Sequence, residues 1–170
     1  ALQIDIGFGD AITPAPRDAT FPTLLPLDPP KVRAYPLETV VAEKFDAVVR
    51  LGRANSRMKD FHDLCTLAAR CDFDGGLLTK AVRATFTRRK ADVSLIPEAL
   101  APDFYDNAIL GQRWRAFVKG KPIANQPEMT FSAVGEQLRA FLGPLGEALA
   151  GNVELVGWSR STGWTARSIE

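Results

Sequence analysis

The sequence contains few of the residue patterns that mark a specialised class of protein. Lysine and arginine number 21 against 20 acidic residues, so the net charge over 170 residues is only +1. This excludes a global positive field, and any contact with nucleic acid must therefore be a local patch. The sequence shows no run of about 18 apolar residues and no basic segment followed by an apolar stretch. We therefore expect no membrane segment and a cytoplasmic location.

Histidine and cysteine are also scarce, and so are glycine-rich loops. His62 is the only histidine, which makes a histidine-rich metal site or a Ser-His-Asp triad hard to build. Cys65 and Cys71 lie six residues apart in one helical pattern, too far for a bridge within a helix, and are expected to be reduced thiols. The segment GFGD at 7–10 completes neither common phosphate-loop spacing.

The remaining composition is that of a globular protein. Apolar types make up 46% of the residues and charged types 24%, with a mean hydropathy of -0.06. These values exclude a disordered, collagen-like or coiled-coil chain. The chain starts at Ala1, without an initiator methionine, and enters an alternating segment at once. We therefore expect a fragment whose upstream part is missing.

The first 36 residues predict a strand and a proline-rich connection. LQIDIGF at 2–8 alternates apolar and polar residues, which predicts a half-buried strand. Seven prolines between Thr13 and Pro36 forbid a helix there and disfavour a central strand. The segment is interpreted as an extended connection, with a short strand near Phe21 to Leu25 as an option.

After Pro36 the apolar period becomes helical. It predicts helices over about 37–51, 57–70, 75–89, 104–118 and 132–150. Asn55 or Ser56 is a candidate cap for the second helix, and Asp72 or Asp74 for the third. The tail from Gly151 is interpreted as a hairpin or a frayed end.

Two side chains stand out as possible ligands of phosphate or metal. Asp5 lies on the polar face of the first predicted strand, where a rigid carboxylate suits Mg²⁺, although a solvated aspartate is the simpler explanation. Lys44 shares a helix face with Val41 and Val48, so its stem lies along the core while its ammonium reaches the edge. There it could meet a phosphate or simply remain in water.

Further charged residues lie near these positions. Glu38 falls close to the Lys44 face, whereas Asp46 and Arg50 are expected to form an ordinary surface pair. Asp60 borders the core face of the second helix and needs a partner, for which its own helix N-terminus is the simplest candidate. Asp63 falls on a more polar side with Lys59. Because Lys44 and Asp60 are placed at the edge of the core, truncating either is expected to leave stability nearly unchanged.

The order of these elements resembles the AbiEii/AbiGii family, nucleotidyltransferase-like toxins of abortive-infection and type IV toxin-antitoxin systems. The similarity is strongest from Asp5 to Leu64. It is carried by IDIGFGD, by an E-x-x-x-A-E-K helix and by R-x-K-D-x-x-D-L. In this chain these motifs supply Glu38, Ala42, Glu43 and Lys44, and then Arg57, Lys59, Asp60, Asp63 and Leu64.

The resemblance implies an α+β fold, made of the last strand of a DNA-polymerase-β-like nucleotidyltransferase core and a mostly helical domain. It divides the chain into a core remnant at 1–35, a helical domain at 36–150 and a tail at 151–170. It implies transfer of a nucleotide from an NTP with Mg²⁺ to an RNA acceptor such as tRNA, and an antitoxin protein as a possible partner.

The resemblance also implies the site. Asp5, Lys44, Asp60 and Asp63 correspond to catalytic positions, with Asp5 as the metal ligand, and Lys44, Glu38 and Lys59 to nucleotide binding. Asp5, Lys44 and Asp60 should then converge on one cleft. The family's upstream Gly-Ser loop and its acidic pair do not occur in this sequence, so the chain alone is expected to lack part of the site. The alternative is a non-catalytic helical module that binds an antitoxin or RNA.

Overall fold

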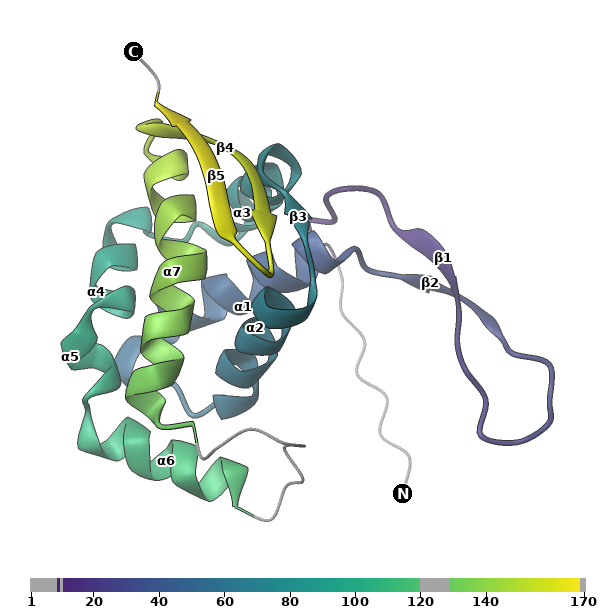
Figure 1. Ribbon diagram of the computed structural model, residues 1–170, viewed down its shortest axis with the longest axis horizontal. Coiled ribbons are helices and arrows are strands. Elements are labelled where there is room, and N and C mark those ends of the chain that lie inside the picture. The colour runs from purple at the N-terminus through teal and green to yellow at the C-terminus, as the bar shows by residue number, and fades with distance from the viewer. Residues whose placement is uncertain (1–8, 10, 120–128, 169–170) are drawn as a thin grey trace.

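The computed structural model describes residue 9, residues 11–119 and residues 129–168. The described part has an α+β fold, with a helical body and two small antiparallel sheets, as predicted (Figure 1). The strand expected over 2–8, and with it Asp5, lies outside the described residues. The division into three domains stays a prediction.

Seven α-helices make up the described part of the body. They are α1 (Leu37–Leu51), α2 (Met58–Arg70), α3 (Gly75–Arg89), α4 (Ile96–Leu100), α5 (Pro102–Tyr105), α6 (Ala108–Val118) and α7 (Phe131–Leu149). Single 3-10 turns precede α2 and α4, at Gly52–Ala54 and Val93–Leu95. Asp74 caps α3, since its carboxylate accepts the Leu77 N–H at 2.8 Å. The first three predicted helices are therefore confirmed to within a residue.

The fourth predicted helix is interrupted. Asn107 accepts hydrogen bonds from the backbone N–H groups of Ile109 and Leu110, which begins α6 and separates it from the short α5. The five-residue α4 was not predicted, because one turn carries too little periodicity to detect.

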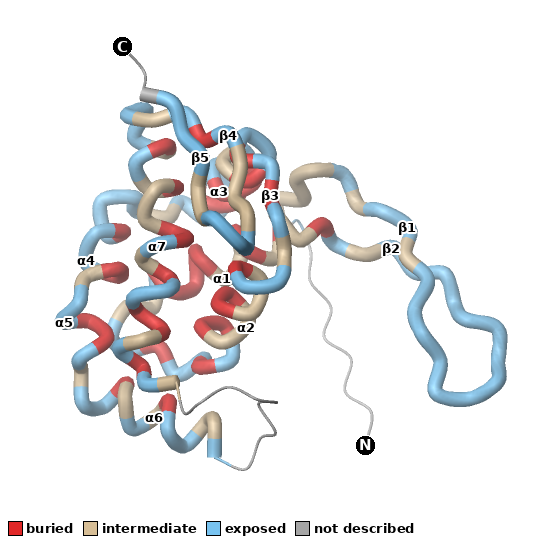
Figure 2. The backbone as a smooth tube through the Cα atoms, in the orientation of Figure 1, coloured by how far each residue is buried: buried red, intermediate tan, exposed pale blue. Residues whose placement is uncertain are grey.

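The core lies where α7 crosses α2, α5 and α6, and buried residues line the inner side of each helix (Figure 2). Phe61, Tyr105 and Phe131 meet edge to face or tilted, with ring centroids 5.1 to 6.3 Å apart. Gly135 permits the close approach of α7, because a Cβ there would lie 2.3 Å from Tyr105 Cγ. A continuous aromatic core therefore holds α2 in a fixed position.

A C-terminal sheet packs on this body. The strands β3 (Phe73–Asp74), β4 (Val153–Ser159) and β5 (Gly163–Ser168) pair antiparallel in that order. Two tryptophans fix the hairpin, since Trp158 Nε1 donates to Ala68 O at 2.9 Å and Trp164 Nε1 to Phe141 O at 2.8 Å. The hairpin interpretation of the tail is confirmed, and the frayed alternative is wrong.

A second hairpin projects from the body as an arm. Its strands β1 (Arg17–Thr20) and β2 (Lys31–Ala34) pair antiparallel and are joined by an exposed loop over 21–30 (Figure 1). The strand suggested near Phe21 to Leu25 is wrong, and so is the plain extended connection. Prolines lack the N–H that a ladder needs, so the pairing forms on either side of the proline-rich loop.

Two further predictions can be compared with the described residues. Cys65 is buried, Cys71 is half-buried, and both are free thiols. Among the described helices, none combines the length and apolarity needed to span a bilayer.

Candidate functional site

The turn between α1 and α2 sets how these two helices meet. Asn55 is fully buried there, and its Nδ2 donates to Ala47 O at 3.4 Å while its Oδ1 accepts the Arg57 N–H at 2.7 Å. The residue therefore ties the end of α1 to the start of α2, three residues before the helix itself begins. The predicted cap of this helix by Asn55 or Ser56 is wrong, because Arg57 is the N-cap residue and no side chain caps α2.

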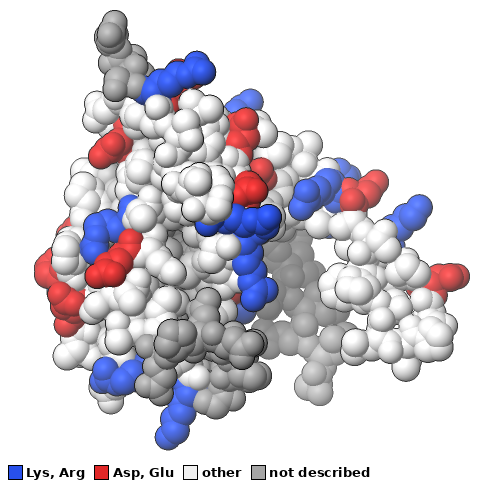
Figure 3. Space-filling view, in the orientation of Figure 1, with Lys and Arg blue, Asp and Glu red and all other residues white. Residues whose placement is uncertain are grey.

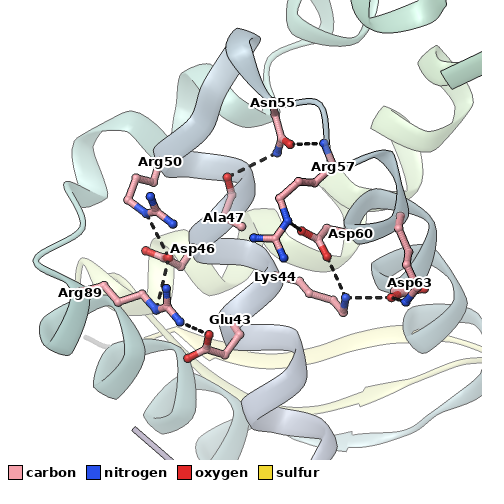
Figure 4. Close-up of polar contacts among 11 residues, drawn as sticks. Glu43, Lys44, Asp46, Ala47, Arg50, Asn55, Arg57, Asp60, Asp63 and Arg89 are labelled. Carbon is pink, nitrogen blue, oxygen red and sulfur yellow. Dashed lines mark hydrogen bonds and ion pairs between the residues drawn. The ribbon is translucent and has the colours of Figure 1, made fainter. Parts of the chain in front are cut away.

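Lys44 of α1 lies between the two acids of α2 (Figure 4). Its Nζ is 2.8 Å from Asp60 Oδ1 and 2.8 Å from Asp63 Oδ2. The exposed fractions of the three side chains are 18% for Lys44, 6% for Asp60 and 23% for Asp63. The motif residues of two separate helices thus form one compact, mostly buried group.

Two more cations complete this group, which is called the Lys44 cluster below. Lys59 Nζ lies 2.6 Å from Asp63 Oδ2. Arg57 Nε lies 3.1 Å from Asp60 Oδ2, an ion pair whose angles are not those of a hydrogen bond. Three cations against two carboxylates leave the cluster with one net positive charge, which favours an anionic ligand.

The contacts shift two pKa values in opposite directions. Burial alone would lower the pKa of Lys44, but the hydrogen bonds and charges of Asp60 and Asp63 outweigh it and raise the pKa above its ordinary value. Burial would raise the pKa of Asp63, yet the hydrogen bonds and charges of Lys44 and Lys59 bring it below its ordinary value. Lys44 and Asp63 are therefore charged throughout the physiological range.

The Lys44 cluster opens onto a cavity of about 270 Å³. Lys44, Arg57 and Asp60 line it together with Tyr35 and Thr39, which lie where the arm joins α1. An ammonium has three N–H donors, and the two acids take two of them. The third has no partner among the described residues and remains for a ligand.

A second charged group lies across α1 and is called the Asp46 cluster (Figure 4). Asp46 is fully buried, and its Oδ2 lies 3.4 Å from Arg50 Nε and 3.7 Å from Arg89 Nε. Arg89 also pairs with Glu43. The pair of Asp46 with Arg50 is confirmed, but the expectation that it is a surface pair is wrong, because α3 covers this side of α1.

The burial of Asp60 corrects two expectations. Its partners are Lys44 and Arg57, and not only the N-terminus of its own helix. Truncation of Asp60 or Lys44 is then not a surface substitution, since removal of either leaves a buried charge with fewer partners. The surface position on which unchanged stability was expected is therefore wrong, and the effect on stability itself stays a prediction.

The other predicted site residues are dispersed. Glu38 lies in the first turn of α1. It does not line this cavity, does not belong to the Lys44 cluster and makes no side-chain bond among the described residues. Lys59 belongs to the cluster through Asp63. Convergence of Lys44 with Asp60 is observed, whereas Asp5, the proposed metal ligand, lies outside the described residues.

The donor set does not fit a magnesium ion within the described part of the chain. No three histidine, cysteine or acidic side chains gather there as a metal would need. Asp60 and Asp63 are already engaged by lysines, whose charge opposes a cation in the same place. These residues are suited to phosphate and not to a divalent ion.

Comparison with protein families shows to which family the chain is related. The model of the family described as nucleotidyl transferase AbiEii toxin, type IV toxin-antitoxin system, matches residues 1–141. The chain belongs to this family. No curated protein and no solved structure matches it significantly. The suspected resemblance is therefore confirmed, and the Lys44 cluster lies wholly within the matched segment.

Proposed function

We propose that this chain serves nucleotidyl transfer from an NTP to an acceptor such as tRNA, as part of a toxin of a bacterial toxin-antitoxin or abortive-infection system. One observation carries the proposal. Lys44 is fixed between two carboxylates beside an open cavity, with one donor left without a partner among the described residues, in a chain that belongs to a nucleotidyltransferase family.

The chemistry requires little of the protein beyond positioned charge. An acceptor hydroxyl attacks the α-phosphorus of the NTP, a new phosphorus–oxygen bond forms, and the bond to the β-phosphate breaks to release pyrophosphate. Lys44 supplies a positive charge and an N–H to the triphosphate. Asp63 and Asp60 hold the ammonium in place, so that it does not need to reorganise during the reaction.

Asp60 has a second role in this proposal. Asp60 lines the cavity, and its Oδ2 is a buried oxygen with no hydrogen bond among the described residues. This oxygen orients the acceptor hydroxyl or takes its proton as the new bond forms. Lys59 and Arg57 keep the cluster positive when the acids are charged.

Magnesium and the antitoxin rest on the family alone, and the cytoplasmic location rests on the sequence pattern. Asp5 is the candidate metal ligand from the resemblance, and the described residues supply no further ligands for an ion. No step of the proposed chemistry is therefore drawn through the metal.

Incorporation of radiolabelled NTP into total RNA tests the proposal. Lys44→Ala should reduce incorporation about a hundredfold or more, which corresponds to roughly 3 kcal/mol in the barrier. Lys80→Ala is the matched control, because Lys80 is an exposed lysine on α3 outside the cluster. The assay is run below the melting temperature of every variant. Equal incorporation by wild type and Lys44→Ala would contradict the proposal.

The alternative is a helical interaction module that binds an antitoxin or RNA without catalysis. The arm favours it, because the exposed loop over 21–30 presents apolar side chains, among them Phe21, Leu24 and Leu27. Figure 3 shows the outer part of the arm as largely uncharged surface. If the wild type incorporates no nucleotide into RNA or protein with any NTP, this alternative replaces the enzyme.

A further inference from the structure

A second cavity, of about 400 Å³, lies between α1 and α3 and is called the arginine pocket. Its wall includes Arg50, Arg88, Arg89 and Thr85. The volume falls within the range of small-ligand sites. The pocket shares Arg50, Arg89 and Glu43 with the cavity of the Lys44 cluster, so the two cavities adjoin along α1.

Arg50 and Arg88 are each hydrogen-bonded through one edge of the guanidinium group, and the other edge has no partner among the described residues. Arg50 donates through Nε to Asp46, and Arg88 donates through Nε to Gly9 O at 2.9 Å. The Nη groups of both have no partner among the described residues. Guanidiniums held in this way present a planar pair of donors, which is the geometry that matches phosphate oxygens.

Among the described residues, the carboxylates near the arginine pocket pair with only two of its three arginines. Glu43 and Asp46 are the carboxylates that pair with Arg50 and Arg89. Arg88 has no carboxylate partner among the described residues, so the pocket retains one positive charge. Structural pairing explains two of the three cations and leaves Arg88 unexplained.

A buried hydroxyl gives an independent sign of a missing ligand. Thr85 is 1% exposed and lines the pocket, and its Oγ1 has no hydrogen-bond partner among the described residues. A buried hydroxyl without a partner costs free energy, which a ligand that accepts its hydrogen would recover.

We propose that the arginine pocket is a phosphate-binding subsite, in which Arg50 and Arg88 donate through Nη and Thr85 through its hydroxyl. The source of the phosphate is either the triphosphate of the nucleotide or the backbone of the acceptor strand. The choice between these two sources rests on the proposed function, whereas the phosphate chemistry does not. Arg89, held by Asp46 and Glu43, is the positioning residue between the two cavities.

Binding of three probes to the full chain tests the subsite: inorganic tripolyphosphate, ATP and a single-stranded RNA 10-mer. Arg88→Gln should weaken tripolyphosphate binding about tenfold, as expected for loss of a charge-assisted bond. Thr85→Val should weaken it severalfold. Arg115→Gln is the matched control, because Arg115 is exposed on α6 away from the pocket, and it should change binding less than about twofold.

Comparison of the three probes shows which molecule supplies the phosphate. A loss with ATP that equals the loss with tripolyphosphate identifies the nucleotide, whereas a loss with tripolyphosphate and RNA but not with ATP, with a salt dependence smaller by about one phosphate contact, identifies the acceptor strand. Either result supports the subsite. If Arg88→Gln and Arg115→Gln bind every probe alike, or the wild type binds none, the subsite is overturned.

The same variants distinguish failure of the subsite from failure of the proposed function. Loss of tripolyphosphate binding in Arg88→Gln, with nucleotide transfer unaffected by Lys44→Ala, would support the subsite and contradict the transferase proposal. The reverse pattern would leave the transferase and overturn the subsite. A thermal melt of each variant shows that the comparison is made between folded chains.

Discussion

The two charged clusters on either side of α1 both contain a buried aspartate, but the two aspartates are satisfied differently. Asp60 accepts a 2.8 Å hydrogen bond from Lys44, whereas Asp46 meets its arginines at 3.4 and 3.7 Å. In each aspartate one carboxylate oxygen has no hydrogen bond among the described residues. Short contacts within an open cavity describe a preorganised site. Long contacts beneath a helix describe a buried charge that holds arginines in place. Burial alone therefore does not show how closely an aspartate is paired.

Removing Lys44 should have the largest effect on stability. Lys44→Ala leaves Asp60 buried beside Asp63 with Arg57 as its nearest cation, and the free energy of unfolding should fall by about 2 kcal/mol. Urea denaturation measures this, and Lys80→Ala should change stability by less than about 0.5 kcal/mol. A Lys44→Ala loss as small as that of the control would show that the cluster does not hold the helices together.

The contact between Lys44 and Asp60 should also be visible as coupling. A double-mutant cycle with Lys44→Ala and Asp60→Asn should give a coupling free energy of about 1 to 2 kcal/mol. Lys80→Ala combined with Asp60→Asn should be additive. Additivity in the first cycle would mean that the 2.8 Å contact does not persist in solution.

Asp46→Asn should cost less than Lys44→Ala, despite the deeper burial of Asp46. The replacement keeps the shape of the side chain and removes a charge that is only loosely paired, so we expect a change of about 1 kcal/mol or less. Urea denaturation of the purified variant measures it. A loss above that of Lys44→Ala would reverse the distinction between the two clusters.

The smallest expected effect is a change in the stability of the folded state that appears only at acidic pH. The lowered pKa of Asp63 means that its charge stabilises the folded state above its ordinary value and that this contribution is lost as pH falls through the lowered value. The stability difference between wild type and Asp63→Asn should therefore be constant near neutrality, begin to shrink below about pH 4 and vanish as pH falls through the lowered value. Thermal melts from pH 7 to pH 2 measure it. A difference that persists at pH 2 would assign the effect to packing.

The sequence predicted the parts of this structure that depend on local periodicity. The helices α1 and α3 have the predicted bounds, because apolar residues repeat through the whole of each. It did not predict the β1–β2 arm, since pairing of Arg17–Thr20 with Lys31–Ala34 spans ten residues whose prolines suggest only an extended chain. Nonlocal pairing leaves little trace in a single sequence.

The candidate site, too, was predicted from the sequence only in part. Its motif residues were visible in the sequence, and Lys44, Asp60 and Asp63 do meet. The deep burial of Asp46 was not predicted, because it depends on α3 packing across α1 and on Arg89, some forty residues away along the chain. The arginine pocket was missed for the same reason.

The central claim is that the cavity beside Lys44 binds a nucleotide, and calorimetric titration with ATP tests it most directly. The wild type, Lys44→Ala and Lys80→Ala are compared in one buffer and at one temperature below all three melting points. The account predicts a dissociation constant raised about tenfold or more in Lys44→Ala and changed less than about twofold in Lys80→Ala. Equal affinity of the wild type and Lys44→Ala for ATP would contradict it.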